Sequence, residues 1–267
     1  MDDVVHAVRW VVEAALRGLD PFAPAVSLAL IAVVTALGML VVVRRTSPQR
    51  AIARTRARMA ASIYEMRLYL DHPLQLLRAQ GRLLGWTGAY LACLLPALLV
   101  LGPPLGLLYL HLETRHGLAP LDAPSTVVVR VELGDGVSTR GVAVEATGAV
   151  AVTAPLVRAD DEGAVYARIA IRARGTHRVT ARAAGAAVTK ELVADPDASV
   201  VAPERRGGFG HTWSLGAEPP PDTAAIRAIS VQHPEREDGL PVRWWLYWLG
   251  LATIVALALR GRFGVEL

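Results

Sequence analysis

Seven histidines are the residues of this 267-residue chain best suited to hold a transition metal. They stand at positions 6, 72, 111, 116, 177, 211 and 233, with no cysteine partner and no His-x-x-x-His pair. Zinc sites use His and Cys ligands at short, regular spacing. The scatter of these histidines therefore gives no warrant for a metal site.

Two clusters contain residue types that bind ions in other proteins. The run from Arg205 to Gly210 has the glycines of a phosphate loop, but it lacks the flanking strand and helix. Asp160, Asp161 and Glu162 could approach Ca²⁺, although three adjacent acids do not match the spacing of a calcium loop. We interpret the first as a flexible loop and the second as a solvated turn.

Nothing in the chain is typical of a hydrolase, because no serine lies in a Gly-x-Ser-x-Gly elbow. We expect neither a cofactor nor catalytic residues, and so not an enzyme. The composition is too apolar for an ordinary cytosolic enzyme, since 53% of the residues are hydrophobic. Of the 28 basic residues only Lys190 is a lysine, and there is no asparagine, which fits a bacterial source. The single cysteine, Cys93, excludes a disulfide within the chain.

Three apolar runs are long enough to cross a bilayer. Residues 25–43 carry no charge and would reach about 30 Å as a helix, and Arg44-Arg45 follows them. Residues 85–112 form the second run, in which Pro96 and Pro103-Pro104 predict a kink. Residues 244–260 form the third, opening with an interfacial belt of tryptophan and tyrosine.

A cleavable signal peptide is the alternative for the first run. Four acids precede the run and an arginine pair ends it, and neither is typical of a signal peptide. Residues 1–22 place valines and leucines on one helical face, which predicts an amphipathic helix on the membrane surface.

A basic loop of residues 44–84 joins the first two runs. It contains nine arginines and only two acids, Glu65 and Asp71, so the positive-inside rule predicts a cytoplasmic loop. Apolar residues recur at helical spacing on both sides of Asp71-His72-Pro73. They are Ile52, Met59, Ile63, Met66, Leu70, Leu74, Leu77 and Leu84. We expect a helical hairpin or short antiparallel coiled coil.

Loop charge also predicts the orientation, with the N-terminus outside and the C-terminal tail of residues 261–267 in the cytoplasm. A multi-pass protein of the bacterial inner membrane follows. The basic loop fits anionic lipid headgroups, and its charge is compatible with attraction to a ribosome. Aromatic residues are too few there for specific nucleic-acid binding.

Residues 125–235 change to short alternating segments separated by turn signals. The expected strands are residues 126–133, 142–146, 165–172, 177–183, 187–193 and 226–231. Such strands predict an extracytoplasmic Ig-like β-sandwich. The Pro- and Gly-rich stretch of residues 195–222 is expected to be a long loop.

The order of these parts resembles the YidC/Oxa-type insertase superfamily, especially its short three-span members from archaea and the endoplasmic reticulum. The resemblance covers the three runs and the hairpin and includes no specific motif. It implies a polar, cytoplasm-facing groove that lets hydrophilic parts of a client enter the membrane. The implied groove residues are Ser27, Thr35, Thr87, Tyr90 and Thr253. The implied cytoplasmic basic face consists of Arg44, Arg45, Arg54, Arg58 and Arg82.

Each groove hydroxyl has a simpler interpretation, a hydrogen bond to its own helix. No span here holds a charge, although many bacterial members of the superfamily place an arginine in the groove. The leading hypothesis is an insertase or chaperone that guides client transmembrane segments. The rival is a membrane-anchored scaffold whose Ig-like domain binds an extracytoplasmic protein, and fold alone cannot assign that partner.

Overall fold

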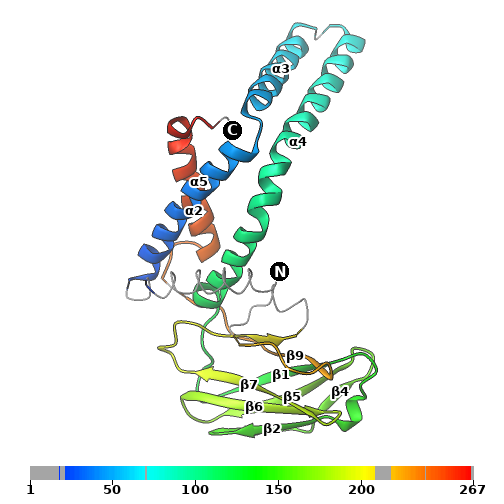
Figure 1. Ribbon diagram of the computed structural model, residues 1–267, viewed down its shortest axis with the longest axis vertical. Helices are drawn as coiled ribbons and strands as arrows, with labels where there is room; N and C mark the ends of the chain where they lie inside the picture. Colours follow the sequence, from blue (N-terminus) through cyan, green and yellow to red (C-terminus); the bar gives the residue numbers. More distant parts are fainter. Residues whose placement is uncertain (1–17, 19–21, 70, 208–217, 238, 266–267) are drawn as a thin grey trace. The chain divides into compact units, whose positions relative to one another are not determined.

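The computed structural model describes residues 18, 22–69, 71–207, 218–237 and 239–265 (Figure 1). These residues belong to two compact units, which are described one at a time. One unit contains residues 25–106 and 241–267, and the other contains residues 1–24 and 107–240. The expected amphipathic helix at residues 1–22 falls almost wholly outside the described residues, as do the last two residues of the C-terminal tail.

The first unit is helical. Its helices are α2 (Pro24–Thr46), α3 (Gln49–Leu68), the larger part of α4 (Pro73–Leu112) and α5 (Trp244–Phe263). Within the described part of the chain, α2, α4 with its continuation to Gly117, and α5 are long and apolar enough to cross a membrane. The prediction of three long apolar helices is therefore confirmed.

Helix α4 continues without interruption from the basic loop into the second apolar run. Pro96, Pro103 and Pro104 all lie inside it. Each proline removes one backbone donor, and long apolar helices accommodate this loss by small local adjustments. The irregularity comes at the end, where a π-helical turn, Glu113–Gly117, follows Leu112.

The second unit is built from nine strands among its described residues. They are β1 (Ser125–Leu133), β2 (Ala143–Thr147), β3 (Val150–Val152), β4 (Val157–Ala159), β5 (Ala164–Ile171), β6 (Gly175–Ala183), β7 (Ala186–Ala194), β8 (Glu204–Arg206) and β9 (Ile226–Val231). One sheet has the order β3-β5-β1-β9-β8, with β4 also paired to β5, and the other has the order β2-β6-β7. All of the pairings are antiparallel.

The inward residues of both sheets form one hydrophobic core. Val129, Val131 and Ile169 come from the larger sheet, Val179 and Leu192 from the smaller one, and all five are fully buried. The alternation that predicted these strands is thus the alternation of core and surface. The predicted antiparallel β region is confirmed, and all six expected strands are present within two residues of their predicted bounds.

Candidate functional site: the apolar helices and the basic hairpin

The first and last apolar helices are joined by a side-chain hydrogen bond. Trp248 of α5 donates its indole N–H to the Thr35 hydroxyl of α2 over 3.4 Å. Trp248 belongs to a buried stripe of α5 at four-residue spacing, continued by Ala252 and Ala256. Small residues on such stripes let helices approach closely in an apolar medium. Thr35 therefore contributes to helix association.

The other groove candidates include two threonines with hydrogen-bond partners in their own helices. Thr87 donates to the carbonyl of Leu83 over 2.9 Å, and Thr253 donates to that of Leu249 over 2.8 Å. These are hydrogen bonds within one helix, as the simpler interpretation predicted. Ser27 is buried and Tyr90 is half-buried. The structure brings Thr35 against a second helix, while a shared polar groove stays a prediction.

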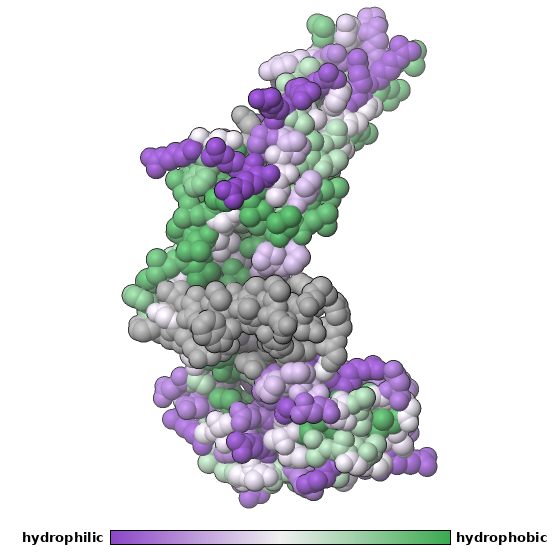
Figure 2. All heavy atoms as spheres, in the orientation of Figure 1, coloured by the Kyte–Doolittle hydropathy of each residue, from purple (hydrophilic) through white to green (hydrophobic). Residues whose placement is uncertain are grey.

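Helix α4 exposes its apolar side chains far more than α2 does. The exposed fractions of Leu91, Leu95, Leu98 and Leu99 are 57%, 51%, 65% and 72%. On the face shown in Figure 2, hydrophobic side chains cover the apolar helices and hydrophilic ones gather along the hairpin. From Leu83 to Leu112 the helix has no Asp, Glu, Lys or Arg, which corresponds to about 45 Å. That length exceeds the roughly 30 Å of a hydrocarbon core.

Helix α3 and the start of α4 form an antiparallel hairpin, as predicted. Arg82 of α4 forms an ion pair with Glu65 of α3 at 2.5 Å. One helical level nearer the apolar helices, the guanidinium of Arg58 lies 4.4 Å from the centre of the Trp86 ring. Such stacked cations are attracted by the ring quadrupole. The two contacts fix the register of the hairpin.

The seam of the hairpin follows a heptad pattern with small polar residues in it. The buried residues of α3, together with its two half-buried methionines, recur in steps of three and four, and residues of α4 recur in the same steps. They are Ile52, Thr55, Met59, Ser62 and Met66 of α3 and Leu76, Ala79, Leu83 and Trp86 of α4. Thr55 and Ser62 fit because each hydroxyl bonds to a carbonyl of its own helix.

Four apolar residues that predicted the hairpin lie outside its seam. Ile63, Leu74, Leu77 and Leu84 have exposed fractions of 47%, 72%, 62% and 73%. Sequence spacing could not separate them from the seam, because the seam accepts threonine, serine and alanine in place of leucine.

All nine arginines of residues 44–84 are exposed. They include every residue of the predicted basic face, namely Arg44, Arg45, Arg54, Arg58 and Arg82. Since the loop holds nine arginines and only two acids, it carries an excess of seven positive charges. This surface can attract polyanions and acidic protein segments over roughly one Debye length, about 8–10 Å.

The β unit contains a buried ion pair that was not predicted from the sequence. Lys190 of β7 points into the core with none of its surface exposed, and its ammonium contacts the Glu218 carboxylate and the Glu191 carbonyl. Burial lowers the pKa of Lys190 and raises that of Glu218, while their mutual attraction opposes both shifts. The signal in the sequence was a lysine at an inward position of an alternating strand. A buried lysine requires an anionic partner, so this position indicated an ion pair.

Arg205 also holds the segment around Glu218 against β7. Its guanidinium donates to the carbonyls of Pro219 and Thr189, which lie on either side of the Lys190–Glu218 pair. The described end of the long loop is thereby held to β7. Of the run from Arg205 to Gly210, the last three residues fall outside the described part of the chain, so the predicted flexible loop stays a prediction.

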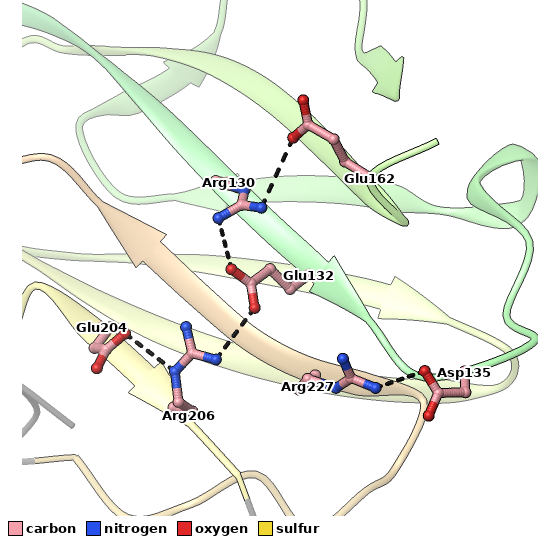
Figure 3. A network of polar contacts seen from close by, with 7 residues as sticks. All are labelled: Arg130, Glu132, Asp135, Glu162, Glu204, Arg206 and Arg227. Atoms are coloured by element: carbon pink, nitrogen blue, oxygen red, sulfur yellow. Dashed lines mark hydrogen bonds and ion pairs between the residues drawn. The ribbon is translucent and has the colours of Figure 1, made fainter. Parts of the chain in front are cut away.

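A second charged network covers the outer surface of the larger sheet (Figure 3). Arg130 contacts Glu132 and Glu162, and Glu132 also contacts Arg206, which contacts Glu204. Flanking carboxylates raise the pKa of Arg206, although its burial acts in the opposite direction as the largest single influence. Arg130 and Arg206 each contact two carboxylates, and the contacts join β1, β8 and the turn between β4 and β5.

Two histidines of the β unit hydrogen-bond to nearby backbone. His177 contacts the carbonyl of Ala173 at 2.8 Å, and His233 contacts that of Val231 at 3.1 Å. Burial lowers the pKa of His233, and the neighbouring Lys190 charge adds to this effect. Both rings have local structural partners.

No family model, no curated protein and no solved structure matches this chain. The resemblance to YidC/Oxa-type insertases therefore rests on the order and character of the segments.

Proposed function

We propose that this chain is a multi-pass membrane protein that guides apolar segments of client proteins into the bilayer. In this proposal the N-terminus is outside, and the hairpin and the C-terminus are in the bacterial cytoplasm. The β unit is an Ig-like sandwich on the outer side. The groove residues of the insertase superfamily are assigned to Ser27, Thr35, Thr87, Tyr90 and Thr253.

The observation that carries the proposal is the continuity and exposure of α4. One 40-residue helix runs from the turn of the basic hairpin into the apolar region. Exposed leucines recur on it from Leu74 to Leu99, including Leu84 near the hairpin and Leu98 in the apolar run, while the leucines nearer its end are half-buried or buried. An apolar client segment would keep its surface covered by moving along this helix. Burial of apolar surface contributes about 25 cal/mol per Å².

Lipid can also cover these leucines, so exposure alone does not separate a guide from an anchor. The difference lies in the stretch of α4 beyond the hydrocarbon thickness, where lipid tails do not reach. The apolar run exceeds the bilayer by roughly 15 Å on the length estimate above. At the hairpin end of this run, Leu84 is 73% exposed and offers apolar surface to a client segment.

The test is insertion of model membrane proteins into proteoliposomes that contain the purified chain. The proposal predicts that the chain increases protease-protected insertion of a short-tailed single-span client, and that Leu91→Glu and Leu98→Glu abolish the increase. Ala61→Glu, on the exposed surface of the hairpin, is the matched control with the same charge change. Insertion that is equal with and without the chain for every client tested would refute the proposal.

The alternative is a membrane-anchored binding protein that recognises an extracytoplasmic partner. It is favoured by the self-contained core of the β unit, which includes inward residues of both sheets. In this case the apolar helices serve as anchors, and Leu98→Glu would lower membrane integration while leaving partner binding by the β unit unchanged.

A further inference from the structure

The turn end of the basic hairpin contains an open pocket of about 620 Å³. It is lined by Tyr69 at the end of α3 and by Gln75, Arg78, Gly81 and Arg82 of α4. The residues of α4 recur in steps of three and four, so they share one face of the helix. Apart from the glycine, every lining side chain carries a hydrogen-bond donor. The pocket is therefore a cluster of donors.

Arg78 brings a positive charge to this pocket without an acid to neutralise it. Among the described residues, its side chain forms no ion pair or hydrogen bond. Arg82 pairs with Glu65 at 2.5 Å, and the other acid of the loop, Asp71, does not line the pocket. Two guanidinium groups thus share the pocket with a single carboxylate beside it, which leaves a positive charge in excess.

The donors favour a phosphate group over a carboxylate. Guanidinium groups form parallel hydrogen bonds with phosphate oxygens. A terminal phosphate has three acceptor oxygens, so it can accept from Arg78, from Arg82 and from a neutral donor at the same time. A carboxylate has two oxygens in one plane, which leaves the donors of Gln75 and Tyr69 unused.

The pocket also has room for the molecule that carries the phosphate. At Gly81 an added Cβ would meet no atom within 4 Å, so the glycine keeps the pocket wide. Arg82 lies directly before the charge-free run that begins at Leu83. A lipid with its headgroup in the pocket can therefore lay its acyl chains along the apolar part of α4. A free phosphorylated molecule can enter from water.

We propose that this pocket binds a terminal phosphate group, carried by a lipid headgroup or by a free small molecule. Arg78 and Arg82 contact the phosphate oxygens, and Gln75 and Tyr69 donate further hydrogen bonds. Glu65 competes with the phosphate for Arg82. This site goes beyond the guiding of client segments, which uses the apolar surface of α4.

The experiment titrates the full chain in a non-ionic maltoside detergent and follows binding by calorimetry. Pyrophosphate is the free probe, and dihexanoyl phosphatidic acid, whose short chains keep it soluble, is the lipid probe. Malonate and dihexanoyl phosphatidylcholine are the comparison compounds. We expect saturable binding of both probes, about tenfold tighter or more than that of either comparison compound. Equal affinities of the two probes would identify the phosphate alone as the ligand, and tighter binding of the lipid probe would identify a headgroup.

Charge variants with matched controls assign the site. Arg78→Gln should weaken binding of pyrophosphate about tenfold. Arg67→Gln removes the same charge from an exposed residue of α3 outside the pocket and should weaken it less than about twofold. Glu65→Gln should strengthen binding because it frees Arg82, whereas Asp71→Asn should change it little.

A glycine pair separates binding from folding. Gly81→Leu places a side chain in the pocket and should abolish binding, whereas Gly88→Leu should leave it unchanged. Both glycines are exposed, and a Cβ at either would meet no atom within 4 Å. Leucine favours a helix over glycine, so both variants should keep α4 intact. Helical circular dichroism checks this.

Four results would overturn the proposal. Malonate that binds as tightly as pyrophosphate would make the pocket a site for any anion, carboxylates of clients included. Equal effects of Arg78→Gln and Arg67→Gln would reduce the binding to diffuse charge. Unchanged binding in Gly81→Leu would place the phosphate outside the pocket. Binding of a short single-stranded RNA without binding of either probe would assign the arginines to nucleic acid.

Discussion

The β unit and the helical unit differ in how their charges are paired and in how far their apolar side chains are buried. In the β unit, charged residues meet one another, as in the networks around Arg130 and Lys190, and the inward aliphatic residues are fully buried. In the helical unit, the loop of residues 44–84 has nine arginines against two acids, and Leu91, Leu95, Leu98 and Leu99 of α4 are more than half exposed. Among the described residues, one unit buries its aliphatic side chains and pairs many of its charges, while the other leaves apolar and basic side chains exposed. The predictions below test this contrast.

The largest expected effect concerns the buried ion pair of the β unit. Glu218→Gln leaves the Lys190 ammonium buried without an anion, which should cost about 3–5 kcal/mol of unfolding free energy. Urea unfolding of the full chain, followed by hydrogen exchange of β7 amides, measures it. Glu145→Gln, which breaks the exposed pair with Arg182, is the control and should cost less than about 1 kcal/mol.

A double variant sharpens this test. Lys190→Met combined with Glu218→Leu removes both charges and should recover most of the lost stability, because apolar replacements of a buried pair are often neutral. If Glu218→Gln and Glu145→Gln lower the free energy of unfolding equally, the Lys190 pair is hydrated in solution.

Leucine truncation compares the two units directly. Leu192→Ala opens a cavity beside fully buried neighbours and should destabilise the β unit by about 2–5 kcal/mol. Leu99→Ala, at a residue that is 72% exposed on α4, should change stability by less than about 0.5 kcal/mol in nanodiscs. A large loss for Leu99→Ala would mean that α4 is packed against protein.

Acid sensitivity should come from His233. Burial lowers its pKa below the ordinary 6.5, so the unfolded state binds the proton more tightly than the folded state. This contribution to stability is present above pH 6.5 and is lost as the pH falls through the folded pKa. His233→Gln should flatten the stability profile in that acid range. A profile unchanged by the substitution would place the acid response elsewhere.

The smallest effect is expected in the hairpin. Glu65→Gln breaks the ion pair with Arg82, whose side chains are 37% and 55% exposed, and should cost less than about 1 kcal/mol. Added salt should reduce the difference between wild type and variant, because exposed pairs are screened. Thermal melting followed by helical circular dichroism at two salt concentrations gives the comparison. A cost that persists at high salt would indicate a pair shielded by a neighbour.

The sequence predicted most of the fold because its signals are local. Charge-free runs and six alternating segments identified the long apolar helices and the main strands. Strands β3, β4 and β8 were missed because each has three residues, too few to show alternation. Their pairing with β5 and β9 depends on distant partners.

The candidate site was predicted only in part for the same reason. The arginines of the hairpin could be counted, and their exposure agrees with that count. The contact of Trp248 with Thr35 and the attachment of Glu218 to Lys190 join residues far apart in the chain, with no spacing rule to connect them. The exposed leucines of the hairpin could not be predicted, because its seam contains Thr55, Ser62 and Ala79. A search for large apolar residues at helical spacing does not detect these three.

The most direct test of the guiding function is site-specific photo-crosslinking to nascent membrane proteins on stalled ribosomes in inverted vesicles. Probes at Arg82, Thr87 and Leu91 lie along the proposed client path, and a probe at Arg168 of β5 reports on the β unit. The proposed guiding function predicts crosslinks from Arg82, Thr87 and Leu91 that shift toward Leu91 as the client lengthens. Crosslinks from Arg168 alone, to a folded partner, would contradict it and would make this chain a membrane-anchored binding protein.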